Sequence, residues 1–99
     1  MRSFVLVAYD IADDTRLRHM FRLLRGYGDH VQYSVFLCQL SEKDKVVLME
    51  KIKDIIHHKE DQVILITLGT VDGARASLPE QWQVLGTRLI LSHKSDMIY

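Results

Sequence analysis

Apolar residues at strand and helix spacing divide the chain into alternating β and α segments. Residues 4–11 (FVLVAYDI) form a short run rich in β-branched and aromatic residues, which is typical of a strand. Apolar side chains occupy both alternating positions, so we expect a central strand that is covered on both faces. Asp10 closes this strand, at the point where the chain leaves the core.

A helix is expected next, from about Asp13 to Tyr27. Asp13 or Asp14 can cap its first turn, and both favour the positive end of the helix dipole. The inward side chains repeat at i, i+3, i+4 and i+7, as one face of a helix requires. These side chains are Leu17, Met20, Phe21 and Leu24.

The middle of the chain alternates apolar and polar residues from Asp29 to Leu40. This segment is longer than a usual strand of about five or six residues, so we expect a break or bulge near Tyr33 and Ser34. A second helix should then run from the capping Ser41 to about His58. Its apolar stripe consists of Leu48, Ile52, Ile55 and Ile56.

The last part of the chain completes the sheet. Residues 62–68 (QVILITL) predict a second strand that is buried on both faces, and Trp82, Val84 and Leu85 suggest a further short strand. The strip from Arg88 to Leu91 is expected to pair with an exposed sheet edge, such as that of another chain. The order predicts one α+β domain over residues 1–99, a ferredoxin-like βαββαβ sandwich, with about residues 80–99 as C-terminal dimerisation strands.

Composition adds little until the positions of the charges are considered. Thirteen basic residues balance thirteen acidic ones, but five of the seven arginines lie within the first 25 residues. Arg18, Arg22 and Arg25 share one helix edge and have no glutamate at helical spacing to pair with, because the acids of this segment cluster at its start. Such a row is either a solvated face, which is the commoner case, or a surface that binds phosphate. Arg16 lies on the other flank of the helix, close to Asp10 in sequence.

Two further residues limit the chemistry that the chain can perform. Asp10 is either a turn former at the end of a strand or a rigidly held metal ligand or acid–base group. Cys38 is the only cysteine, which excludes an internal disulfide and fits a cytoplasmic location. No apolar run approaches the length of a membrane span, so we expect no membrane association.

Three separate stretches resemble one known family. They are Tyr9-Asp10-Ile11-x-Asp13-x-x-Arg16, Leu24-x-x-Tyr27-Gly28, and residues 31–38 (VQYSVFLC). At this spacing they resemble the small CRISPR-associated nuclease of the spacer-acquisition machinery, the second universal acquisition protein and the partner of the CRISPR integrase. The resemblance covers the first forty residues closely and continues loosely to Leu68 through the order of the elements.

The resemblance implies a homodimer and an endonuclease that uses Mg²⁺, with Mn²⁺ as an alternative ion, on RNA or double-stranded DNA. Asp10 matches the metal-binding and catalytic aspartate of the family. Tyr9 and Phe36 match aromatic positions at the dimer site. The nucleic-acid-binding residues expected from the resemblance and from the charge pattern are Arg16, Arg18, Arg22, Arg25 and His30.

Two positions depart from the family pattern. His30 stands where the family often has arginine, which predicts a weaker and pH-sensitive phosphate contact. Leu37 stands where the family often has glutamate, and this substitution is compatible with weak nuclease activity. The alternatives are a catalytically idle adaptor that bridges the integrase and a DNA duplex, a toxin-type mRNA interferase of similar fold, and a ligand-sensing module.

Overall fold

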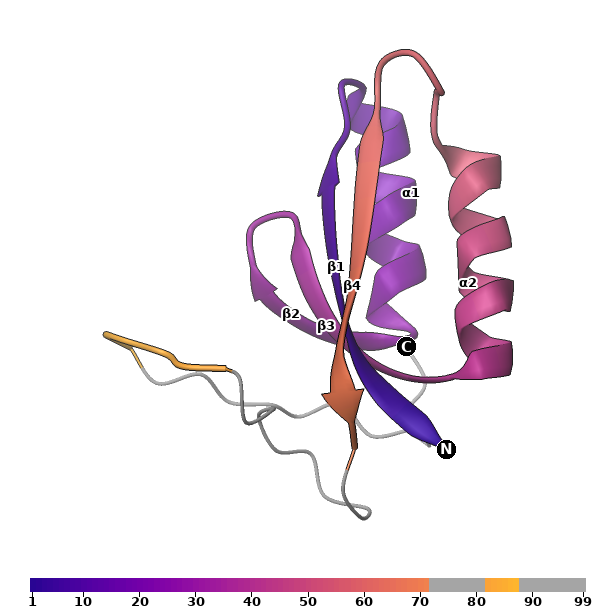
Figure 1. The fold of residues 1–99 in the computed structure, drawn as a ribbon. Helices are drawn as coiled ribbons and strands as arrows, with labels where there is room; N and C mark the ends of the chain where they lie inside the picture. Colours follow the sequence, from indigo (N-terminus) through magenta and orange to yellow (C-terminus); the bar gives the residue numbers. More distant parts are fainter. Residues whose placement is uncertain (72–81, 88–99) are drawn as a thin grey trace.

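The computed structural model describes residues 1–71 and 82–87. It has the order expected from the sequence, with β1 (Arg2–Asp10), α1 (Asp14–Arg25), β2 (Gly28–Gln32), β3 (Val35–Ser41), α2 (Glu42–Ile55) and β4 (Gln62–Thr70). The four strands form one antiparallel sheet in the order β2-β3-β1-β4. Both helices lie on the same side of this sheet (Figure 1). The ferredoxin-like α+β fold is therefore confirmed.

The core lies between the two helices and the face of the sheet that they cover. Val5, Val7 and Tyr9 of β1 point into it, as do Phe36, Cys38 and Leu40 of β3. The expected helix stripes are confirmed at their centres, because Met20 and Leu24 of α1 and Leu48 and Ile52 of α2 are buried. We refer to this face of the sheet as the helix side and to the opposite face as the open side.

Helix ends and the hairpin follow local chemistry. Asp13 caps α1 by accepting from the Arg16 backbone N–H at 2.9 Å, and Ser41 caps α2 by accepting from the Asp44 N–H at 3.1 Å. The expected break in the middle segment is confirmed as a turn between β2 and β3. Ser34 has φ 65° there, in the left-handed region that residues other than glycine seldom adopt.

Gly28 allows β2 to approach β3 closely. A Cβ atom at this position would collide with the Leu37 carbonyl oxygen and would lie 2.7 Å from the Cα of Cys38. Backbone atoms cannot give way as a flexible side chain can, so only glycine fits this start of the strand.

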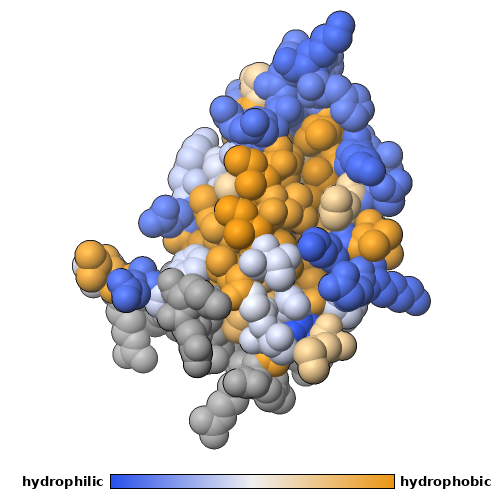
Figure 2. Space-filling view, viewed as in Figure 1, coloured by the Kyte–Doolittle hydropathy of each residue, from blue (hydrophilic) through white to orange (hydrophobic). Residues whose placement is uncertain are grey.

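The two apolar strands differ in burial, which corrects one expectation. β1 is central, as predicted, between β3 and β4. β4 lies at the edge of the sheet, and Ile64 and Ile66 on its open side are 47% and 46% exposed. The prediction that this strand is buried on both faces is therefore wrong for a single chain. Figure 2 shows apolar side chains gathered across the middle of the view that contains β1 and β4.

The described part of the C-terminal region also differs from expectation. Residues 82–87 contain no strand, and Leu85 is 93% exposed, so the short strand expected at Trp82, Val84 and Leu85 is wrong. This segment instead lines a hollow of about 660 Å³ together with Leu6 and Val35 on the open side. The strip from Arg88 to Leu91 lies outside the described residues. No helix among residues 1–71 and 82–87 has the length and apolar character needed to cross a membrane.

Candidate nucleic-acid interface

Asp10 is the exposed last residue of the central strand. It pairs with Gln62 at the start of β4, so its backbone is fixed by the sheet. Tyr9 points into the core on the helix side, and successive side chains of a strand point to opposite faces. The Asp10 carboxylate therefore leaves the sheet toward the open side, at the end of the strand where α1 begins.

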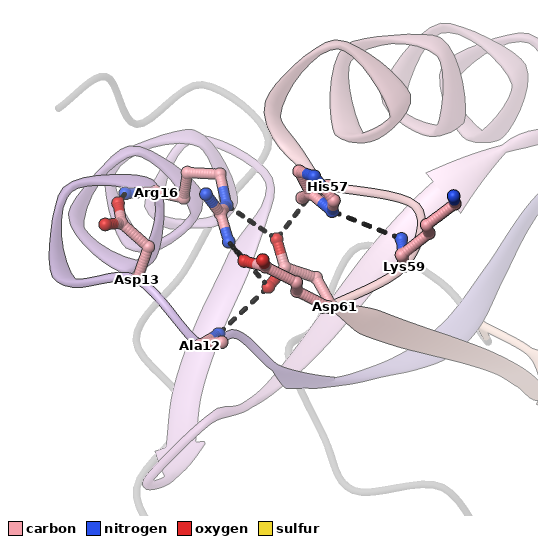
Figure 3. A network of polar contacts seen from close by, with 7 residues as sticks. Ala12, Asp13, Arg16, His57, Lys59 and Asp61 are labelled. Atoms are coloured by element: carbon pink, nitrogen blue, oxygen red, sulfur yellow. Dashed lines mark hydrogen bonds and ion pairs between the residues drawn. The ribbon is translucent and has the colours of Figure 1, made fainter.

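The turn that follows Asp10 is held by a buried carboxylate, Asp61. Its side chain accepts from the Ala12 N–H at 2.9 Å, the Arg16 Nε at 2.7 Å and the His57 N–H at 2.8 Å. Figure 3 shows these groups converging from the start of α1 and from the loop between α2 and β4. We call this arrangement the Asp61 clasp. It ties together the two connections that flank Asp10.

Charge and hydrogen bonding in the clasp reinforce each other. The Asp61 side chain is 0% exposed, and the Arg16 guanidinium lies against it as an ion pair. The hydrogen bond from Arg16, supported by those from the His57 and Ala12 backbone, holds the pKa of the Asp61 carboxyl far below its usual value. Asp61 is therefore a carboxylate at neutral pH, and its negative charge is matched within the fold.

Arg16 has two acidic partners. Besides Asp61, it donates to Glu60 at 3.0 Å, so its guanidinium is already engaged within the chain. A phosphate would have to compete with both carboxylates. The assignment of Arg16 to nucleic acid stays a prediction, and the structure gives this residue a structural task.

The other expected phosphate-binding residues gather around one hollow. It has a volume of about 360 Å³ and lies between α1 and the turn that joins β2 to β3. Arg18, Arg22, Arg25 and His30 all line it. The helix edge noted in the sequence is thus brought beside the β2–β3 hairpin, and the described residues that line the hollow include no acid.

Aromatic rings pack against one another beside these arginines. The His30 ring lies 4.9 Å from that of Phe36 at 31°, and 5.0 Å from that of Phe21 at 87°. Tyr9 also stacks on Phe36, with 6.3 Å between the ring centres and 26° between the ring planes. The Arg25 guanidinium lies 5.7 Å from the centre of the Phe21 ring.

Tyr9 and Phe36 are core residues of the single chain. Phe36 is fully buried and Tyr9 is 7% exposed, both on the helix side. Their expected place at a dimer site stays a prediction. Because Phe36 is fully buried, it could affect contact with a second chain only through the residues that surround it.

A divalent cation would find one well-placed carboxylate here. Within residues 1–71 and 82–87, no group of three or more His, Cys, Asp or Glu side chains is arranged to hold a metal ion. Mg²⁺ often uses one or two carboxylates and completes its six oxygens with water and phosphate. Asp10 fits that mode as one ligand, and Mg²⁺ or Mn²⁺ binding by Asp10 stays a prediction.

The clasp is not predicted by the sequence. Arg16 and Asp61 are separated by 45 positions, so no helical or strand spacing links them. The only signal is weak: an acidic pair, Glu60 and Asp61, stands directly before a strand, where a turn or cap would be the ordinary interpretation.

Comparison with known proteins places the chain in a family context. The sequence profile of the family described as "CRISPR associated protein Cas2" matches residues 1–75. A protein of Rhodospirillum rubrum named CRISPR-associated endoribonuclease Cas2 1 is 37% identical over 83 residues, which cover 81% of each chain. A Thermodesulfovibrio yellowstonii protein named CRISPR-associated endoribonuclease Cas2 2 is 40% identical over 69% of this chain and 75% of its own.

Solved structures with a similar fold agree with the family match. A hypothetical protein from Thermus thermophilus superposes with a TM-score of 0.73 at 30% identity, covering 93% of this chain and 100% of its own. Cas2 of Streptococcus pyogenes superposes with a TM-score of 0.63 at 35% identity, covering 67% of this chain and 86% of its own.

Proposed function

Since the chain belongs to the Cas2 family of CRISPR-associated proteins, we propose that it is a metal-dependent endonuclease that hydrolyses phosphodiester bonds in RNA or double-stranded DNA. The observation that carries this proposal is Asp10. Its carboxylate is exposed at the end of the central strand, and the Asp61 clasp holds the turn beside it. Similar proteins are named endoribonucleases, which supports the class of reaction.

Asp10 would be the protein ligand of Mg²⁺, with Mn²⁺ as an alternative ion. When bound, such an ion lowers the pKa of a coordinated water and stabilises negative charge on the reacting phosphate. The chain itself contributes a fixed oxygen donor. Because sheet pairing sets the position of Asp10, little reorganisation is needed when the ion and phosphate arrive.

A homodimer is the second part of the proposal. The open side of the sheet exposes Ile64 and Ile66, and a small domain gains stability by covering such a face with a second copy. Asp10 leaves the strand toward the same side. Twofold pairing would therefore bring two Asp10 carboxylates toward one ion, which makes up for the single carboxylate of each chain.

The surface around the 360 Å³ hollow would carry the nucleic acid. Arg18 and Arg22 lie on the same edge of α1 and line the hollow, where a phosphate backbone would find positive charge. Such a surface serves a nuclease and also an adaptor that holds a duplex for the integrase. We include partnership with the CRISPR integrase in spacer acquisition in the proposal, on the strength of family membership.

The deciding experiment is a cleavage assay with Asp10→Asn. The substitution keeps the size of an exposed side chain, so the free energy of unfolding should change by less than about 0.5 kcal/mol. Cleavage of RNA and of duplex DNA should fall at least about a hundredfold, as expected when a hard cation loses its carboxylate ligand. Wild-type activity should require Mg²⁺ or Mn²⁺ and stop with a chelator.

Asp54→Asn, on the exposed face of α2, is the matched control and should cleave like wild type. Heterodimers with one Asp10→Asn chain test the shared ion, because they should be strongly impaired rather than half active. Full activity of the Asp10→Asn homodimer would remove Asp10 from the chemistry. A wild-type protein that cuts neither substrate would favour the adaptor.

A further inference from the structure

The hollow beside α1 combines two kinds of chemistry. Leu17 and Phe21 give it an apolar floor, while arginines of the same helix stand along its rim. Its volume of about 360 Å³ is at the lower end of the range for small-molecule sites, roughly 300–1,000 Å³. A ligand that suits it would be small, flat or apolar in one part, and negatively charged in another.

The imidazole ring of His30 lines this hollow and is held by two aromatic contacts. The ring lies 4.9 Å from that of Phe36 at 31° and 5.0 Å from that of Phe21 at 87°, yet the residue remains exposed. Two ring contacts restrict the rotation of an imidazole, so its exposed part keeps one orientation. A fixed and partly exposed aromatic ring is suited to stacking with another planar ring.

Tyr33 stands at the mouth of the hollow and is 83% exposed. The turn that presents it is firmly set, because the Ser34 carbonyl accepts from the Tyr9 N–H at 3.0 Å. Ser34 keeps the unfavourable φ of 65° in this turn. Backbone strain of this kind persists where the surrounding structure enforces it, and often at binding sites. The strained turn therefore presents a large aromatic side chain to solvent.

We propose that this hollow binds an unpaired nucleobase, stacked against His30 and Tyr33, with the adjoining phosphates on Arg18 and Arg22. The proposal rests on the proposed nucleic-acid function and adds to it a site for a single base. Every base has a π face, so stacking tolerates any sequence. A base inside a duplex is already stacked and paired, and it would have to leave the helix to enter. The hollow would thus take a base only at a position where the strand is unpaired or locally opened.

The inference can be tested by binding, without cleavage. A short fluorescein-labelled strand of thymidines is compared with an abasic strand of the same length and charge, in the presence of a chelator. Stacking of one base changes affinity by roughly 5- to 150-fold in other proteins. We expect the wild-type protein to prefer the base-bearing strand within that range.

Variants at Tyr33 and Arg22 separate the two contributions. Tyr33→Ala should lose most of the preference for bases and Tyr33→Phe should keep it. Arg22→Ala should weaken binding of both strands by a similar factor. Val46→Ala removes an exposed apolar side chain from α2, which contributes no residue to the lining of the hollow. This variant should bind both strands with the affinity of the wild-type protein. Thermal melting of each variant shows that the fold is retained.

Equal affinity of the wild-type protein for the two strands would overturn the base site and leave phosphate binding intact. A preference for bases that survives Tyr33→Ala unchanged would also overturn it. Failure to bind either strand, or duplex DNA and RNA, would contradict the proposed nucleic-acid function itself.

Discussion

The Asp61 carboxylate receives hydrogen bonds from the backbone of Ala12, the backbone of His57 and the side chain of Arg16. Such an arrangement favours the ionised form, because each donor points at an acceptor that carries negative charge. An uncharged side chain of the same shape would keep part of the geometry and lose the ion pair. Asp61 is thus the residue on which the connections around Asp10 depend.

Asp61→Asn should lower the urea midpoint of unfolding at neutral pH. Because the pKa of Asp61 is lower in the folded than in the unfolded chain, its stabilising effect is present above the unfolded value of about 3.9. The effect disappears as the pH falls below that value. Urea titrations should therefore show a difference between wild type and variant that is constant from pH 5 to 7 and shrinks in acid.

Asp54→Asn again provides the control, since Asp54 is exposed on α2 and should give a small difference at every pH. A difference for Asp61→Asn that persisted unchanged into strong acid would mean that shape, and not charge, explains its effect.

For single residues, the sequence predicts where a side chain lies on its helix or strand better than it predicts which side chain it contacts. Asp10 at a strand end and Arg18 and Arg22 on a shared helix edge follow from spacing along one element, which is local information. The pairing of Arg16 with Asp61 joins residues 45 positions apart and depends on how distant elements meet, which no spacing rule contains. The packing of His30 on Phe36 is local to the β2–β3 hairpin, but it depends on the register shift between His30 and Gln32.

Among the elements, β1 and β4 show where prediction from the apolar pattern reaches its limit. Both are continuous apolar runs, and the pattern predicts burial on two faces for both. β1 has neighbours on both sides, whereas β4 has only β1 beside it among the described residues. A run of apolar residues indicates that a strand is shielded from water, but it does not indicate whether the same chain or another chain shields it. The same composition therefore fits a central strand and an edge strand at an interface.

The helix α1 carries the prediction that belongs to this scale. Arg18, Arg22 and Arg25 lie along the hollow, so we expect them to contact phosphates. Replacing all three with alanine should reduce the dependence of log K on log salt by about 0.9 for each phosphate of duplex DNA that is no longer neutralised. Fluorescence anisotropy across a series of salt concentrations measures this slope.

The matched control replaces Lys43, Lys51 and Lys53 of α2 with alanine, which removes three exposed cations from the other helix. Its slope should stay close to that of wild type. An unaltered slope for the α1 variant would show that the arginine row is a solvated surface.

For the whole molecule, the main asymmetry is that both helices cover one side of the sheet (Figure 1). The fold class and the order of elements can be predicted because helix and strand periodicities are distinct over this chain. The sequence predicts one segment that could pair with a sheet edge, the strip from Arg88 to Leu91, which lies outside the described residues. The proposed homodimer would instead cover the open side of the sheet with the open side of a second copy.

Ile66→Glu tests the homodimer. A carboxylate at this position costs little in a monomer, where Ile66 is already 46% exposed. In a twofold interface it would be buried twice, so the dissociation constant should rise at least about tenfold, equivalent to about 1.4 kcal/mol. Sedimentation or light scattering across a concentration series measures the change.

Val46→Glu places the same charge on α2, where Val46 is 61% exposed, and should leave the association state as it is. If Ile66→Glu and wild type associated equally, the open side would not be the contact between copies.

The buried Cys38 thiol can report how often the core of this protein opens to solvent. The single thiol is 0% exposed in the core, and burial raises its pKa to about 12. A thiol-reactive dye therefore has neither access nor a thiolate to attack while the core is closed. The labelling rate at neutral pH would then report how often the interior becomes open to solvent. Nucleic acid, metal or a second chain that binds the closed form should each slow this reaction in proportion to their occupancy.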